Sequence, residues 1–235
     1  MDYYDLIIWL KNYEDNFEKQ VERVYASLTE MAKIDNMAPK YLTAMSKESA
    51  PEFELTKENV EQLVVDKQDK KFPDLGSNIS FFSSKDDSKI CGIGVSAGIK
   101  NSKFVNTVTA SISFMNLQND MKKRNQIVNL FKRLIDINDA FYGCIVDNTN
   151  YNLYDGYYNY TTKLPRSVFW VNYWGNEIID RLPQENLAIE NIEDEVYQLR
   201  KGEKGCFIRL SETSIFDDEE KVALQRKVNK KLGLQ

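Results

Sequence analysis

The stretch FVNTVTASISF, residues 104–114, alternates between two kinds of side chain. Every second position from Phe104 to Phe114 is mostly apolar, whereas the positions between them are mostly threonine or serine. A β-strand turns successive side chains to opposite faces, so this alternation predicts a strand with one buried and one solvated face. Strands of this kind are typical of antiparallel sheets that are open to water on one side. The stretch therefore favours a mostly antiparallel sheet.

The residues before this stretch predict its hairpin partner. The segment CGIGVSA, residues 91–97, also alternates, and residues 98–103 predict the turn that joins the two strands. Its glycines superficially resemble a phosphate loop, in which backbone amides at the start of a helix hold an anion. Their spacing matches no nucleotide-binding glycine pattern, and a strand follows them. We expect instead small side chains that pack under a helix.

Helical periodicity flanks the predicted strands on both sides. Apolar residues recur every three or four positions from Phe17 to Met31, which predicts an amphipathic helix. A second helix is expected over 56–65 with Thr56 as its N-cap, a third over 119–137, and a closing helix after the acids of 217–220. The sequence FPDLG, residues 72–76, predicts a turn that leads into the strands.

Further strands are expected before and after this central region. Residues 2–10, 140–146, 167–173 and 206–210 have the apolar character of strands, and 176–182 predicts a short helix. No internal repeat or low-complexity linker separates these elements. The sequence therefore predicts an α+β fold, a mostly antiparallel sheet flanked by helices, in a single domain over residues 1–235.

The 235 residues contain no histidine. Histidine is the commonest general base, the usual partner of serine and cysteine nucleophiles, and the commonest metal ligand. We therefore expect no catalytic residues and no enzyme activity. Carboxylate chemistry with bound magnesium remains open as the alternative, with Asp86, Asp87, Asp217 and Asp218 as the only obvious ligands.

Composition also bears on cofactors, partners and location. The three cysteines, Cys91, Cys144 and Cys206, are widely spaced, so neither a disulfide framework nor a zinc site is indicated, and we expect no cofactor or metal. The net charge of -5 disfavours nucleic acid and anionic membranes as partners. The apolar run of residues 6–10 lacks a basic flank and is too short to span a bilayer. We therefore expect a cytoplasmic protein.

The segment DNTNYNLYDGYYNY, residues 147–160, has the least ordinary composition in the chain. It holds five tyrosines, four asparagines, two aspartates and one glycine. Tyrosine offers a large amphipathic contact surface at low entropic cost, and asparagine offers adaptable hydrogen bonds. This composition is typical of a loop that binds a protein, although a loop whose tyrosines pack back on the domain has the same composition. The predicted partner-binding residues are Asp147, Tyr151, Tyr154, Asp155, Tyr157, Tyr158 and Tyr160.

The region from Glu185 to Glu220 is strongly acidic, with eleven acids against four bases. Such a region is able to attract a positively charged ligand. The acids of 217–220 have a simpler structural explanation, because carboxylates in the first turn of a helix are favoured by its exposed amides and dipole. For the acids of 193–195 we expect a solvated surface.

Three stretches together resemble one family. FPDLGSNISFF at 72–82 resembles the leucine-glycine turn and strand pair of the immunity protein 52 family, and WVNYWGNE at 170–177 is similar to its tryptophan and tyrosine strand. GCFIRL at 205–210, with the helix after it, looks like the closing strand and helix of that family. With the amino-terminal strand and helix, the resemblance covers nearly the whole chain. Phe82 departs from the pattern, since a tryptophan is common at that place.

The resemblance implies a function as well as a fold. Members of the family are α+β cytoplasmic antidotes of bacterial polymorphic toxin, contact-dependent or type VI secretion systems, often encoded beside toxins with a restriction-endonuclease-like nuclease domain. It therefore implies a chain that binds a cognate toxin stoichiometrically and neutralises it. An antidefence or adaptor protein of a mobile element remains open, because such a protein also acts by binding another protein. The sequence does not indicate an oligomeric state.

Overall fold

The computed structural model describes residues 3–11, 16–101, 103–113, 117, 119–159, 161–183, 189–215 and 218–234. The chain divides into two compact units. The first unit contains residues 7–115 and 125–140, and the second contains residues 2–6, 116–124 and 141–235. Strand β1 and helix α3 thus contribute residues to both units. Each unit is described by itself below.

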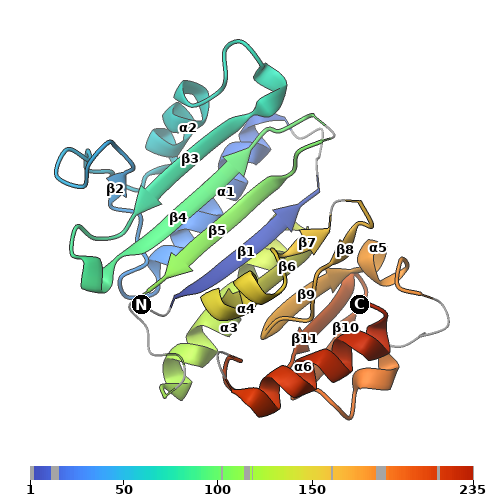
Figure 1. The fold of residues 1–235 in the computed structure, drawn as a ribbon. Helices are drawn as coiled ribbons and strands as arrows, with labels where there is room; N and C mark the ends of the chain where they lie inside the picture. The colour runs from blue at the N-terminus through green and yellow to red at the C-terminus, as the bar shows by residue number, and fades with distance from the viewer. Residues whose placement is uncertain are drawn as a thin grey trace. The chain divides into compact units, whose positions relative to one another are not determined.

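The first unit is built on an antiparallel sheet. Its strands follow the order β1-β5-β4-β3-β2 (Figure 1). The predicted hairpin is present, because β4 pairs antiparallel with β5 and places Ile93 opposite Ala110. Strand β3 pairs with β4 in the same sense. The bounds are β1 (Tyr4–Leu10), β2 (Tyr41–Leu42), β3 (Ser77–Phe82), β4 (Cys91–Ala97) and β5 (Asn106–Ile112).

The two faces of this sheet differ as the alternation of residues predicted. In β5, Val108, Ala110 and Ile112 are buried, whereas Ser111 is exposed. In β4 the expectation for the glycines was wrong in one respect. Gly92 and Gly94 are half-buried and alternate with the buried Cys91, Ile93 and Val95, so they lie on the hydroxylated face and not on the apolar face.

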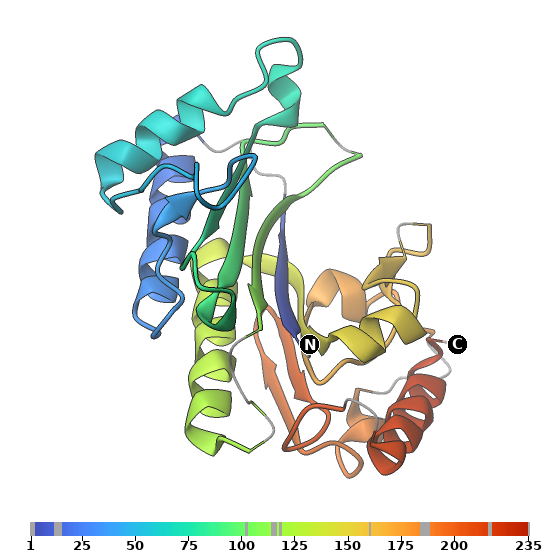
Figure 2. The same ribbon diagram turned by 60° about the vertical axis from the view of Figure 1, so that its left-hand side comes forward.

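Helices cover the apolar face of the first unit (Figures 1 and 2). Helix α1 (Phe17–Ala32) begins at Asn16, whose side chain accepts a hydrogen bond from the amide of Lys19. Helix α2 (Lys57–Asp66) is capped by Thr56, as predicted. In helix α3 (Met121–Asn138), Asn138 donates a hydrogen bond of 2.9 Å to the hydroxyl of Ser27 on α1. The bond between Asn138 and Ser27 thus joins α3 to α1.

The predicted turn before β3 depends on Gly76. The short 3-10 helix η1 (Pro73–Leu75) ends at Gly76, which has φ 63° and ψ -151°, a backbone conformation that is essentially restricted to glycine. A Cβ atom at this position would lie 2.2 Å from the carbonyl oxygen of Ala97. Gly76 is therefore required for β3 to begin beside β4.

The second unit has its own run of antiparallel strands, in the order β10-β11-β9-β6. Strand β11 pairs with β10 on one side and with β9 on the other. Strand β10 was not predicted from the sequence. Its residues, QLRKG, lie at an exposed edge and do not alternate between apolar and polar side chains. The bounds are β6 (Ala140–Asp147), β7 (Tyr158–Asn159), β8 (Leu164–Pro165), β9 (Val171–Gly175), β10 (Gln198–Gly202) and β11 (Gly205–Arg209).

Within the described part of the second unit, helices α4 (Asn148–Leu153), α5 (Asn176–Ile179) and α6 (Glu219–Leu232) follow the start of α3. Helix α6 is joined to the segment before β9 by a buried polar network. Asn229 accepts a hydrogen bond from the amide of Val168 and donates one to the hydroxyl of Ser167, while Gln225 donates to the same hydroxyl. All of these side chains are fully buried, so the network specifies where α6 docks.

The predicted fold class is confirmed. Helices flank a mostly antiparallel sheet, and every strand pair whose register is described runs antiparallel. The expected strand at 167–173 is shorter and begins at Val171, and the helix after it ends at Ile179. Phe114, at the end of the stretch that predicts the sheet, lies outside the described residues. The single domain over 1–235 stays a prediction.

Candidate partner-binding site

The tyrosine-rich segment follows directly after β6 in the second unit. Strand β6 ends at Asp147, whose side chain accepts a hydrogen bond of 2.9 Å from the amide of Asn150 and so caps helix α4. Carboxylates are among the best N-cap groups, which explains why a helix begins at this residue. Asp147 is 1% exposed. Its carboxylate therefore supports α4 from the inside, and it does not reach a partner while it keeps this cap.

A tight turn separates α4 from β7. Asp155 has φ 52° and Gly156 has φ 105°, so two successive residues adopt left-handed backbone conformations. Aspartate and glycine tolerate these conformations better than other residues do. The turn leaves Asp155 exposed at the surface, and it leads into β7, which pairs with β8.

Tyr157 is anchored at both its side chain and its backbone. Its phenol donates a hydrogen bond of 2.9 Å to Oδ2 of Asp5, and its carbonyl oxygen accepts one of 3.1 Å from the phenol of Tyr142. Burial raises the pKa of the Tyr157 phenol well above its usual range, and the nearby carboxylate of Asp5 adds to the effect. Tyr157 therefore stays protonated and acts as a hydrogen-bond donor.

The tyrosine rings pack against one another and against neighbouring aromatic residues. The rings of Tyr151 and Tyr157 have centroids 4.5 Å apart, and Tyr154 meets Phe169 edge to face at 6.2 Å. Tyr158 lies 5.4 Å from the ring of Tyr142. Tilted and edge-to-face pairs at these distances are favourable beyond the area that they bury. The rings are thus held in place before any partner arrives.

The tyrosines of the segment pack back on the domain, as one of the two alternatives expected, and binding of a protein by the segment stays a prediction. Tyr151, Tyr154, Tyr157 and Tyr158 are each half-buried, so they pack on the domain and still present an edge to solvent. Leu153, which the sequence did not single out, is 51% exposed beside them. Tyr160 lies outside the described residues. We define the tyrosine-rich surface as Tyr151, Leu153, Tyr154, Asp155, Tyr157 and Tyr158.

Some of the acids between 185 and 220 are paired with lysines. Glu195 receives hydrogen bonds from Lys227 at 2.6 Å and Lys231 at 2.8 Å, and these bonds lower the pKa of its carboxyl. Glu190 forms an ion pair with Lys201. Glu193 and Asp194 are exposed and have no ion pair within the described part of the chain. The expected attraction of this region for a positive ligand stays a prediction.

The carboxylates considered for magnesium have structural roles. Asp86 accepts a hydrogen bond of 2.9 Å from the amide of Ser88, and Asp87 forms an ion pair with Lys47. Asp218 caps α6. Asp217 lies outside the described residues. Among the residues with described positions, no three histidine, cysteine, aspartate or glutamate side chains are grouped so that they could hold a metal ion.

Some residues that support the tyrosine-rich surface could not be predicted from the sequence. Asp5 and Phe169 support the tyrosines, but they are separated from Tyr157 in the sequence and occur in apolar stretches. An acid within an apolar strand is the only sequence signal that points to Asp5.

In the part of the chain that the structure describes, no helix has the length and apolar character needed to cross a membrane.

Comparison with known proteins bears on the fold. No family model matches the chain, and no curated protein matches it. Among solved structures, the chain is similar to "Pseudomonas aeruginosa T6SS protein PA0821", with a TM-score of 0.66 and 11% sequence identity. The match covers 100% of this chain and 76% of that chain. The likeness shows a common fold, and the resemblance to the immunity protein 52 family stays a prediction.

Proposed function

We propose that this chain is a protein-binding component of a type VI secretion system, and that it neutralises a cognate toxin by forming a stoichiometric complex with it. The observation that carries the proposal is the tyrosine-rich surface. Its rings are already fixed by stacking and by the bond from Tyr157 to Asp5, so little side-chain freedom is lost when a partner docks. Tyrosine is also among the residues that dominate the energetics of protein interfaces.

The link to type VI secretion rests on two supports. The structural neighbour from Pseudomonas aeruginosa bears the name of a T6SS protein and has the same fold. The sequence stretches at 72–82, 170–177 and 205–210 resemble a family of antidotes in such systems. We propose that the partner is a toxin, and that the toxin is a nuclease.

Electrostatics agrees with such a partner. A nuclease needs a positively charged surface to hold nucleic acid. This chain carries a net charge of -5, and Asp155 stands exposed beside the tyrosines. Complementary charge of this kind accelerates association more than it strengthens the final complex. Inhibition then requires binding and no reaction on the part of this chain.

The experiment compares two exposed apolar residues. Leu153 belongs to the tyrosine-rich surface, and Met45, which is 106% exposed, lies in a loop of the first unit. Each is replaced by glutamate, and the affinity of the chain for the product of the neighbouring toxin gene is measured by calorimetry. We expect Leu153→Glu to weaken binding about tenfold or more, because it places a solvated charge in the interface. Met45→Glu is expected to leave the affinity unchanged.

Two negative results have different meanings. Equal affinities for both variants would remove the tyrosine-rich surface from the proposal while leaving the complex itself in place. Failure of the unmodified chain to form any complex with the adjacent gene product would contradict the toxin-neutralising function.

A further inference from the structure

Strand β11 ends in a buried arginine. Every residue from Gly205 to Arg209 is buried, and Arg209 is only 6% exposed although its side chain carries a full positive charge. A buried charge is costly unless an opposite charge or several hydrogen bonds compensate it. The surroundings of this guanidinium therefore indicate how the charge is kept stable.

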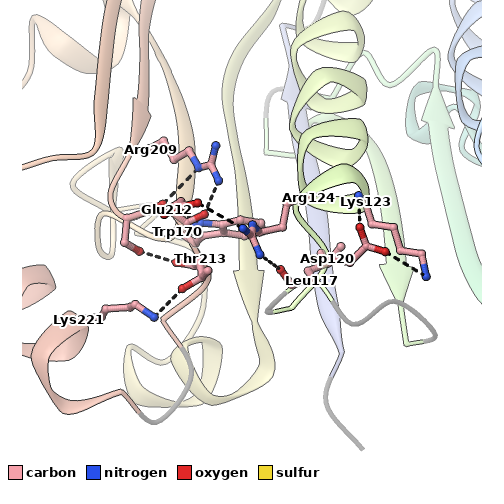
Figure 3. A network of polar contacts seen from close by, with 10 residues as sticks. Leu117, Asp120, Lys123, Arg124, Trp170, Arg209, Glu212, Thr213 and Lys221 are labelled. Carbon is pink, nitrogen blue, oxygen red and sulfur yellow. Dashed lines mark hydrogen bonds and ion pairs between the residues drawn. The ribbon is translucent and has the colours of Figure 1, made fainter.

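The contacts of Arg209 are with carbonyl groups and aromatic rings, and Figure 3 draws its hydrogen bonds beside Trp170. Its Nε donates a hydrogen bond of 3.2 Å to the carbonyl oxygen of Ser211, and its Nη2 donates one to the carbonyl oxygen of Glu212. The guanidinium carbon lies 4.9 Å from the ring centroid of Tyr197 and 5.7 Å from that of Trp170. These partners hold the plane of the group, but none of them carries a full negative charge.

One donor group of Arg209 is left over. Within the described ranges no carboxylate forms an ion pair with Arg209, and Nη1 has no hydrogen bond there. Figure 3 shows no contact to this nitrogen among the residues drawn. The guanidinium is thus fixed by its neighbours and has spare donors.

A second buried arginine lies close to the first. Arg124, at the start of α3, is 5% exposed and donates a hydrogen bond of 3.1 Å to the carbonyl oxygen of Leu117. It shares an ion pair of 3.4 Å with Glu212, whose side chain is 55% exposed. Burial lowers the pKa of Arg209, and the positive charge of Arg124 acts in the same direction. The cluster therefore concentrates positive charge around one half-exposed carboxylate.

The rim of this cluster is aromatic. Tyr197 is 57% exposed and covers the guanidinium of Arg209 from one side. Trp170 is fully buried and donates a hydrogen bond of 3.1 Å from its indole N–H to the carbonyl oxygen of Ser211. Its ring is therefore held in a fixed position next to the guanidinium of Arg209. Arginine, tyrosine and tryptophan are the residue types most enriched among the energetic centres of protein interfaces.

We propose that Arg209, together with Arg124 and Tyr197, binds a carboxylate from an acidic side chain of a protein partner. A carboxylate offers two oxygens that match the parallel donors of a guanidinium. The exposed ring of Tyr197 supplies contact area around the ionic bond. The residues involved are all outside the tyrosine-rich surface, so this site is tested independently of the proposed toxin.

The test uses sodium acetate as the probe on the whole chain. The side-chain Nε–H signals of the arginines and the indole N–H signal of Trp170 are followed by NMR while acetate replaces chloride at constant ionic strength. We expect saturable shifts of the Arg209 and Trp170 signals, because acetate would bind the Nη1 donors of a guanidinium whose carbon lies over the indole ring. Arg209→Lys is expected to abolish the Trp170 shift, whereas Arg200→Lys, at an exposed position on β10, is expected to retain it.

Glu212 provides a second variant that does not depend on removing a buried residue. Its carboxylate is the anion already present, so Glu212→Gln removes a competitor and is expected to strengthen acetate binding about threefold or more. Glu203→Gln, an exposed control on the hairpin between β10 and β11, is expected to leave the affinity unchanged.

Three results would overturn the proposal. One is the absence of saturation with acetate, and another is an unchanged or weaker acetate affinity in Glu212→Gln. The third is a saturable response to inorganic phosphate with none to acetate, which would assign the arginines to a phosphorylated ligand and not to an acidic protein side chain.

Discussion

Two neighbouring tyrosines of the tyrosine-rich surface have opposite hydrogen-bonding situations. The phenol of Tyr157 donates to the carboxylate of Asp5. The phenol oxygen of Tyr154 is buried and has no hydrogen-bond partner among the described residues. A hydrogen bond to a charged group stabilises a fold, whereas a buried polar atom without a partner carries the cost of its lost hydration.

This difference predicts opposite effects of the same substitution. Tyr157→Phe is expected to lower the free energy of unfolding by about 1–2 kcal/mol, because Asp5 loses its donor. Tyr154→Phe is expected to leave it unchanged or to raise it by up to about 1 kcal/mol. Urea denaturation of both variants checks the prediction, and each serves as the control for the other. Equal losses in the two variants would contradict the described geometry.

At the level of elements, helix α6 has a pH-dependent cap. Asp218 accepts hydrogen bonds from the side chain and the amide of Lys221, and these bonds lower the pKa of its carboxyl. A carboxyl whose pKa is lower in the folded than in the unfolded state stabilises the fold at neutral pH. That contribution is lost as the pH falls through the folded-state pKa, below about 4.

The variant Asp218→Ala makes this dependence measurable. At pH 7 the free energy of unfolding of this variant is expected to be about 1 kcal/mol lower than that of the unmodified chain, because the cap is lost. At pH 3 the difference is expected to shrink, since the protonated carboxyl accepts hydrogen bonds less strongly. Denaturation curves at both pH values give the comparison, and a difference that grows on acidification would refute the assignment.

The elements that the sequence predicted are those with a regular pattern of their own. The spacing of apolar residues marks α1, the cap Thr56 marks α2, and the alternation of 104–114 marks β5. Strands β2, β7 and β8 have only two residues each. They exist only because a partner strand lies beside them. A local pattern carries no information about such pairing.

The composition of the sequence points to the candidate site, but it does not reveal which contacts hold the tyrosines in place. Five tyrosines within residues 147–160 identify the segment. The sequence does not reveal that Tyr157 bonds to Asp5, because that contact joins residues 152 positions apart. It also does not separate the buried cap Asp147 from the exposed Asp155, since both are aspartates in the same polar segment. Tertiary packing decides both questions.

At the scale of the whole molecule, three buried cysteines report on how the chain opens. Burial raises the pKa of Cys91 to about 12 and that of Cys206 to about 11, and Cys144 is affected in the same direction. Only the thiolate reacts with common thiol reagents. The folded chain is therefore expected to resist labelling at pH 8, and reaction requires opening of the structure.

The positions of these cysteines test the prediction of one domain. Cys91 lies in the first unit, and Cys206 lies in the second. If residues 1–235 unfold as one cooperative domain, both thiols become reactive at the same urea concentration, as peptide-resolved mass spectrometry would show. Separate midpoints would instead indicate that the two units open independently.

Strand β4 alternates between two kinds of position. Ile93 and Val95 are packed in the interior, so a substitution at either position disturbs the neighbours that it touches. Gly92 faces the other way, and a methyl group added to it would meet nothing closer than the Cβ of Ser111 at 3.8 Å. A small side chain at position 92 therefore fits without disturbing the interior, whereas a Cβ atom at Gly94 on the same face would lie 2.6 Å from Oγ1 of Thr109. Position 92 is thus a point on β4 where the chemistry of the surface can change at little cost to folding.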